Sequence, residues 1–143
     1  MNVFLDTNVL IDILVRREDE SLNKDSVQAV SNALFLGMDL KASAISVATL
    51  NYILKKLPPA ARKEKITKLI QATGLEILPA TEGHVKAALE GMFDDLEDAM
   101  QNACAQENGC EILLTRNVSD FRASDLCVFS PKEFVRQTSP LEP

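Results

Sequence analysis

Three aspartates that lie far apart in the sequence are the strongest candidates for chemistry: Asp6, Asp98 and Asp120. Asp6 follows the short apolar run Val3-Phe4-Leu5 and precedes the polar pair Thr7-Asn8. This pattern predicts a buried strand that delivers Asp6 to its carboxyl end, where a helix begins. Ligands of open parallel α/β sheets bind at that edge. A carboxylate placed there is a candidate ligand for a hard divalent cation.

The other two acids are predicted to follow later elements. Asp98 lies in an acidic run at the start of a predicted helix, and Asp120 comes just after a predicted strand at 111–114. Segments that follow neighbouring parallel strands can meet at one edge of the sheet. Each acid also has a simpler explanation. The helix dipole favours acids such as Glu97 and Asp98 in a first turn, and Asp120 can cap a short turn that Phe121 anchors in the core.

The remaining reactive side chains are expected to have no catalytic role. Asp12 lies six positions after Asp6, and we expect it to face solvent or to pair with Arg16. A single histidine cannot build a zinc cluster, so His84 is expected at the surface or at a helix cap. The cysteines are odd in number and have no C-x-x-C spacing, which predicts free, mostly buried thiols in a reducing compartment. They are Cys104, Cys110 and Cys127.

Predicted strands alternate with helical patterns along the chain. The strands are expected at 2–5, 40–44, 76–78, 111–114 and 126–129. Helices are expected from about Asp25 to Gly37, from a cap at Ser46 to Pro58, over 60–72, from a cap at Thr81 to about Met92, and over 96–106. This alternation predicts an α/β fold with a parallel sheet covered on both faces. Strands buried on both faces should be continuous apolar runs, as several of these are.

Size and composition are those of one globular domain. The chain has 143 residues, of which 46% are apolar and 25% charged, and we expect a single domain over 1–138 with a loose tail at 139–143. A net charge of −6 argues against a broad, non-specific nucleic-acid binder. It is compatible with a nuclease whose acids gather in one cleft. The absence of a membrane-spanning segment and of a signal peptide predicts a cytoplasmic protein.

Four motifs occur in a characteristic order from residue 1 to about 135. They are Asp6-Thr7-Asn8, then Ile45-Ser46-Val47-Ala48-Thr49-Leu50, then Glu97-Asp98-Ala99, then Thr115-Arg116-Asn117 with Asp120-Phe121. Together they resemble the PIN domain, and most closely its VapC-like toxins from prokaryotic toxin–antitoxin pairs. The resemblance implies a metal-dependent ribonuclease on a three-layer α/β/α sandwich with a parallel sheet of about five strands. It also implies a homodimer, an RNA substrate and an antitoxin partner.

The resemblance also assigns roles to individual residues. Asp6, Asp98 and Asp120 would hold Mg²⁺ or Mn²⁺, with Asp6 and Asp98 as direct ligands and Asp120 as a ligand or a base that orients water. The metal would supply the activated water and the charge relief that phosphodiester hydrolysis needs. Side chains at the same edge would bind the substrate; these are Thr7, Asn8, Thr115, Arg116 and Asn117.

One position departs from the pattern of the family. Many members carry an acid in the helix after the second strand, where this chain has Asn51. An amide oxygen can coordinate a hard cation or a bound water, but it brings no charge. Glu97 compensates if its side chain points inward. Two functions stay open: an endoribonuclease that serves as the toxin of a toxin–antitoxin pair, or a catalytically weak module that binds RNA or a protein partner without efficient turnover.

Overall fold

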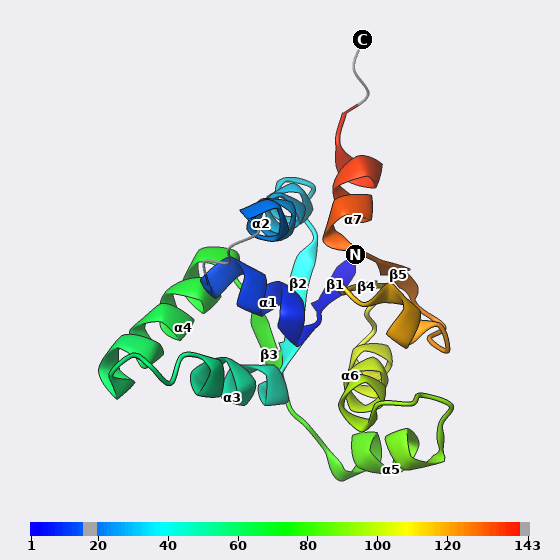
Figure 1. The fold of residues 1–143 in the computed structure, drawn as a ribbon. Coiled ribbons are helices and arrows are strands. Elements are labelled where there is room, and N and C mark those ends of the chain that lie inside the picture. The colour runs from blue at the N-terminus through cyan, green and yellow to red at the C-terminus, as the bar shows by residue number, and fades with distance from the viewer. Residues whose placement is uncertain (16–19, 141–143) are drawn as a thin grey trace.

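The computed structural model describes residues 1–15 and 20–140, and its centre is a five-stranded sheet (Figure 1). The strands lie in the order β3-β2-β1-β4-β5, and every neighbouring pair is parallel. Their bounds are β1 (Asn2–Leu5), β2 (Asp39–Ser43), β3 (Glu76–Leu78), β4 (Ile112–Leu114) and β5 (Cys127–Phe129). The predicted parallel five-stranded α/β fold is confirmed.

Helices connect the strands and cover the sheet (Figure 1). They are α1 (Thr7–Leu14), α2 (Glu20–Phe35), α3 (Ala44–Ile53), α4 (Pro59–Thr73), α5 (Glu82–Glu90), α6 (Leu96–Glu107), the 3₁₀ helix η1 (Val118–Phe121) and α7 (Pro131–Thr138). No helix in the described part of the chain is long and apolar enough to cross a membrane.

The two faces of the sheet form two separate apolar cores. Val3 and Leu5 of β1 pack in one core with side chains of α1, α2, α3, α4 and α7. Phe4, between them, packs in the other core with residues of α6 and η1, including Phe121. Successive side chains of a strand point to opposite faces. A strand covered on both sides must therefore be apolar throughout, which explains the Val3-Phe4-Leu5 run.

The central strand β1 has β2 on one side and β4 on the other. The chain crosses from β1 to β2 and β3, and only later returns to add β4 and β5 beyond the other edge of β1. Ligands of open α/β sheets bind outside the carboxyl ends of strands at such a switch point. The backbone N–H of Asp6 donates to the Leu114 carbonyl across it, at 2.9 Å. The topology thus brings residue 6 and residues 115–120 to one edge.

Helix boundaries follow the predicted signals with three exceptions. Thr81 caps α5, Gly74 ends α4 in the left-handed conformation at φ 64°, and α6 begins at Leu96. Ser46 was expected to cap α3, but the cap is Ser43, whose hydroxyl accepts from the backbone N–H of Ile45.

The second exception is α7, which is absent from the predicted order. It begins with Ser130, whose hydroxyl accepts from the Glu133 backbone N–H, and with Pro131 in its first turn. These three residues form a helix start signal. The helix was not predicted because the segment that follows them is short. The third exception is the start of α2, which lies at Glu20 rather than near Asp25.

His84 and the cysteines occupy structural positions. His84 is buried rather than at the surface, and its ring nitrogen accepts from the backbone N–H of Thr81 in the cap of α5, as the cap expectation required. The cysteines are free, with Cys104 and Cys110 buried and Cys127 exposed. Residues 141–143 of the predicted loose tail lie outside the described residues.

Candidate active site

Asp6 is a buried carboxylate at the junction of β1 and α1. Its side chain is 4% exposed. One oxygen accepts from the backbone N–H of Thr7 at 2.8 Å, and the other accepts from the Thr115 hydroxyl at 2.8 Å. Both donors are neutral, and no lysine, arginine or histidine among the described residues forms an ion pair with Asp6. The carboxylate is therefore held in place without being neutralised.

A chain of hydrogen bonds behind Asp6 links three helices. The Thr7 hydroxyl and the Ser46 hydroxyl of α3 lie 2.7 Å apart, and both residues are buried. Gln101 of α6, also buried, donates from Nε2 to the Thr7 hydroxyl at 3.2 Å and to Glu97 at 3.4 Å. These contacts fix the positions of α1, α3 and α6 relative to one another around Asp6.

The segment after β4 is tied to α1 by Asn8. The Asn8 amide donates to the Thr115 hydroxyl at 3.3 Å and accepts from the backbone N–H of Arg116 at 3.2 Å. The Thr115 hydroxyl also accepts from the Asn117 backbone N–H at 3.1 Å. Thr7 and Thr115 are buried, whereas Asn117 is exposed and Asn8 and Arg116 are half-buried. The predicted substrate residues thus divide into two buried hydroxyls that support Asp6 and three side chains with access to solvent.

Asp12 does not face solvent as expected. It is fully buried, and its Oδ2 lies 3.0 Å from Nε of Arg116 and accepts from the Ser26 hydroxyl at 3.0 Å. The expected pairing with Arg16 lies outside the described residues. The expectation that Asp12 faces solvent was wrong, because local spacing cannot reveal a partner that is distant in the sequence. Asn8 and Asp12 lie four residues apart on α1, so together they hold residues 115–117 from one helix face.

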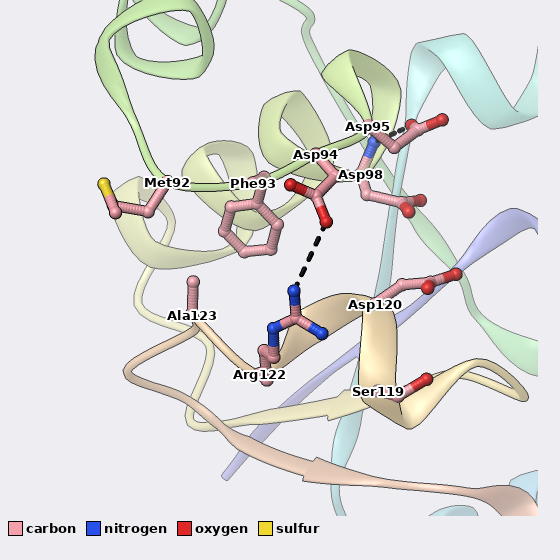
Figure 2. A pocket seen from close by; sticks show the side chains of 9 residues that line it. All are labelled: Met92, Phe93, Asp94, Asp95, Asp98, Ser119, Asp120, Arg122 and Ala123. Atoms are coloured by element: carbon pink, nitrogen blue, oxygen red, sulfur yellow. Dashed lines mark hydrogen bonds and ion pairs between the residues drawn. The ribbon is translucent and has the colours of Figure 1, made fainter.

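Asp98 and Asp120 face the same open pocket. Asp98 lies in the first turn of α6, where its backbone N–H donates to the capping carboxylate of Asp95 at 2.9 Å. Asp120 is an exposed residue of η1, which the buried ring of Phe121 anchors. The pocket has a volume of about 300 Å³, and Figure 2 shows both carboxylates pointing to the same side of it. Its lining residues are Met92, Phe93, Asp94, Asp95, Asp98, Ser119, Asp120, Arg122 and Ala123.

Electrostatics connect Asp6 to this pocket, although Asp6 does not line it. Burial, which has the largest effect, and four neighbouring carboxylates together raise the pKa of Asp98 to about 7. In order of effect they are Asp6, Asp95, Asp120 and Glu97. Burial also raises the pKa of Asp6, with a contribution from Glu97, although hydrogen bonds from Thr115, Thr7 and Gln101 oppose the increase. Asp98 is therefore close enough to both other predicted acids to respond to their charges.

The donor set fits a hard divalent cation in its chemistry. The groups are carboxylate oxygens, which Mg²⁺ and Mn²⁺ prefer, and their mutual repulsion would be relieved by a positive charge. Among the described residues, however, no three histidine, cysteine or acidic side chains lie close enough together to enclose an ion. An ion at this edge would therefore depend on water molecules, or on further oxygens of the chain, to complete its coordination.

Glu97 and Asn51 occupy different positions relative to the acids. Glu97 acts on both Asp6 and Asp98 through its charge and accepts from Gln101, so it belongs to the acidic group. Asn51 is an exposed residue of α3. Within the described residues, no hydrogen bond joins Asn51 to any of these carboxylates. The position that departs from the pattern of the family therefore forms no hydrogen bond with the described acids.

Gln101 is the site residue that the sequence interpretation missed. A glutamine in an amphipathic helix is normally part of the solvated face, and nothing in its type marks it as buried. Its spacing is informative, however, because residues three and four apart share a helix face. Gln101 follows Asp98 by three positions and Glu97 by four, which places it beside both acids.

Comparisons with known proteins agree with this architecture. A family model described as PIN domain matches residues 2–119. Ribonuclease VapC1 from Aquifex aeolicus (strain VF5) is 33% identical over 144 residues, which cover 97% of this chain and 96% of that protein. A chain of the FitAcB crystal structure from Neisseria gonorrhoeae is 26% identical with a TM-score of 0.63, and it covers 90% of this chain and 97% of its own length.

A more distant neighbour shows the same fold. A chain of VapBC-1 from nontypeable Haemophilus influenzae is 18% identical with a TM-score of 0.66, and it covers 92% of this chain and 98% of its own length. The family model spans the strands and helices that carry Asp6 and Asp98 and ends at residue 119, next to Asp120. Because the model matches most of the chain and the Aquifex relative matches nearly all of it, the chain belongs to the PIN domain family.

Proposed function

We propose that this protein is an endoribonuclease that uses a divalent ion, Mg²⁺ or Mn²⁺, to hydrolyse phosphodiester bonds of RNA. The relative from Aquifex aeolicus is named a ribonuclease, and the structure carries an acidic group at the switch point of the sheet. The observation that carries the proposal is that Asp98 of α6 and Asp120 of η1 line one pocket, with buried Asp6 near enough to raise the pKa of Asp98. If these acids served only as helix or turn caps, acids from separate elements would have no reason to lie close together.

The roles of the three acids follow from their exposure. Asp6, which is buried and fixed by two hydrogen bonds, and half-buried Asp98 would hold the ion. A bound divalent ion lowers the pKa of a coordinated water and offsets charge on the phosphoryl oxygens. Asp120, which is exposed on η1, would orient the attacking water and accept its proton. No histidine, cysteine or serine nucleophile is needed for this reaction.

We propose that RNA contact falls to the accessible side chains of the same edge. Asn117 is exposed, and half-buried Arg116 is held through Nε by Asp12, which leaves its two terminal nitrogens as donors. An arginine donates two parallel hydrogen bonds to a phosphate group. Asn8 would assist through its contact with the Arg116 backbone. Thr7 and Thr115, being buried, would act on the substrate only through Asp6.

The direct test is cleavage of RNA by purified protein in the presence of Mn²⁺ or Mg²⁺. We expect cleavage by the wild type, its loss on addition of a chelator, and its loss in the variant Asp120→Asn. The matched control is Asp39→Asn, which alters an exposed aspartate at the amino end of β2, on the opposite edge of the sheet. Binding of RNA and Mn²⁺ without cleavage would instead favour the catalytically weak module.

We also propose an antitoxin partner, as the resemblance to VapC-like toxins implies. A groove of about 490 Å³ between α1, α2 and α4 supports this proposal, because its walls are largely apolar. Ile13, Leu14, Val27 and Leu34 contribute apolar surface, and Lys65 and Lys68 border the groove. Such a groove suits an amphipathic partner helix. The change Leu34→Glu should weaken binding of a protein encoded beside this one without altering RNA cleavage.

We propose in addition that the protein forms a homodimer. Large apolar side chains remain exposed, including Tyr52 and Ile53 at the end of α3. Light scattering on a gel-filtration column measures the molar mass directly. Twice the mass of the 15.7 kDa chain would support the dimer, and the mass of a single chain would exclude it.

A further inference from the structure

Gln101 has one hydrogen-bonding group with no partner. Its side chain is 1% exposed, and its Nε2 donates to Thr7 and Glu97. Its Oε1 is buried and accepts no hydrogen bond from any described residue. Glu97 fixes the orientation of this amide, because turning it over would set Oε1 against a carboxylate oxygen. The unpartnered atom is therefore the oxygen.

A buried carbonyl oxygen without a donor carries a free-energy cost, and native proteins rarely leave one in that state. The groups nearest this amide cannot remove the cost. Asp6 and Glu97 are acceptors when ionised, and the Thr7 hydroxyl is already shared with Ser46 and Gln101. The missing partner must come from outside the polypeptide, and only a water molecule or a cation meets that requirement.

The location of this oxygen favours the cation. Gln101 donates to Thr7, the residue next to Asp6, and to Glu97, so its amide lies beside two members of the acidic group. Among the described residues, that group lacks three carboxylates close enough to enclose an ion, and Asn51 is exposed on α3. An amide oxygen is an acceptable ligand for hard divalent ions and adds no repulsive charge.

We propose that Gln101 is an additional oxygen ligand of the divalent-ion site, with Oε1 bound to the ion directly or through one water of its hydration shell. This inference rests on the proposed function, because it assumes that the acidic group binds Mg²⁺ or Mn²⁺. The two polar atoms of the Gln101 amide would then have different roles. Nε2 holds Glu97 and Thr7 in place, and Oε1 completes the coordination.

Calorimetric titration of the full chain with Mn²⁺ tests this assignment through two variants. Gln101→Met removes both amide atoms at nearly the same size, and we expect Mn²⁺ affinity to fall by about 10- to 100-fold. Gln101→Glu keeps an oxygen at Oε1 but loses the Nε2 donor, and we expect it to bind Mn²⁺ at least as tightly as the wild type. If Gln101 only positioned Glu97 and Thr7, both variants would lose affinity.

The control is Gln106→Met, which makes the same change at an exposed position of the same helix and should leave Mn²⁺ affinity unchanged. Thermal unfolding with and without Mn²⁺ verifies that each variant folds and shows whether the ion stabilises it. Equal affinity in wild type and Gln101→Met would overturn the assignment and identify the partner of Oε1 as a structural water. A wild type that binds no Mn²⁺ would instead refute the proposed function itself.

Discussion

Two aspartates close to each other in sequence, Asp6 and Asp12, are both buried, but their surroundings differ in charge. Asp12 lies 3.0 Å from the guanidinium of Arg116, so its charge is compensated from within the chain. Asp6 receives hydrogen bonds from Thr7 and Thr115 but no ion pair from the described residues. Burial raises the pKa of Asp6, which means that its negative charge is costly in the folded chain.

The difference separates a structural acid from a functional one. A buried charge with a partner in the chain stabilises one arrangement of its neighbours, here the segment 115–117 against α1. A buried charge without one represents a cost that an external cation can remove. Burial alone would have grouped the two residues together. The presence or absence of a counter-charge tells them apart.

The largest effect should come from Asp6→Asn. We expect RNA cleavage to fall by about a thousandfold or more, which corresponds to about 4 kcal/mol of transition-state stabilisation. The fold should survive, and the thermal midpoint without metal at pH 8 should equal or exceed that of the wild type, because a costly charge is removed. Measurements of kcat/KM with Mn²⁺ and of thermal unfolding test both parts. Undiminished cleavage by this variant would remove Asp6 from the catalytic machinery.

Asp12→Asn should have the opposite effect on stability. Removal of the Asp12 charge leaves the half-buried Arg116 without this partner, and we expect a loss of about 1–3 kcal/mol in the free energy of unfolding, measured with urea. The double variant with Arg116→Gln should cost less than the sum of the single changes, because the two side chains act as a pair. Additive losses would show that the observed contact contributes little.

A pH-dependent effect is expected at Asp98, where burial and neighbouring acids raise the pKa from 3.8 to about 7. The folded chain binds this proton more tightly than the unfolded chain, so stability declines as pH rises from about 4 to about 7 and then levels off. Asp98→Asn should therefore raise the thermal midpoint above pH 7 without divalent ions and change it little below pH 4. A constant difference in thermal midpoint between the wild type and Asp98→Asn across the whole pH range would contradict the raised pKa of Asp98.

The smallest effect is expected at Asn51, which is exposed and has no hydrogen bond to the acids. Asn51→Ala should leave Mn²⁺ affinity unchanged and alter the free energy of unfolding by less than about 0.5 kcal/mol. Calorimetry and urea unfolding measure these quantities. A clear loss of affinity would mean that this position contributes to the site after all.

The sequence was sufficient to predict the fold because its signals are local. An apolar run that ends at Asp6, a cap at Thr81 and a glycine stop at Gly74 each act within a few residues, and the structure contains all three. The acids that follow strands or open helices could also be proposed, since a parallel sheet brings such positions to one edge. Their roles as ligands stay predictions.

The features that were missed depend on contacts between distant segments. The partner of Asp12 lies beyond β4, and no periodicity on α1 reveals it. The buried state of Gln101 depends on Thr7 and Ser46, which come from two other helices. Ser46 itself was assigned to a cap because Ser43, three residues earlier, could not be distinguished by type alone. Polar residues with long-range partners are thus the hardest to predict from one sequence.

The central position of β1 has a consequence for the order in which the protein is made. This strand leaves the ribosome before the other four, yet its neighbour β4 and the Thr115 hydroxyl that donates to Asp6 come 109 positions later. Contacts so distant along the chain form late and slowly. An unfinished polypeptide therefore carries Asp6 without the Thr115 hydroxyl that helps to fix its carboxylate. For a toxin, synthesis as far as β4 and Thr115 must precede any damage to the cell's RNA.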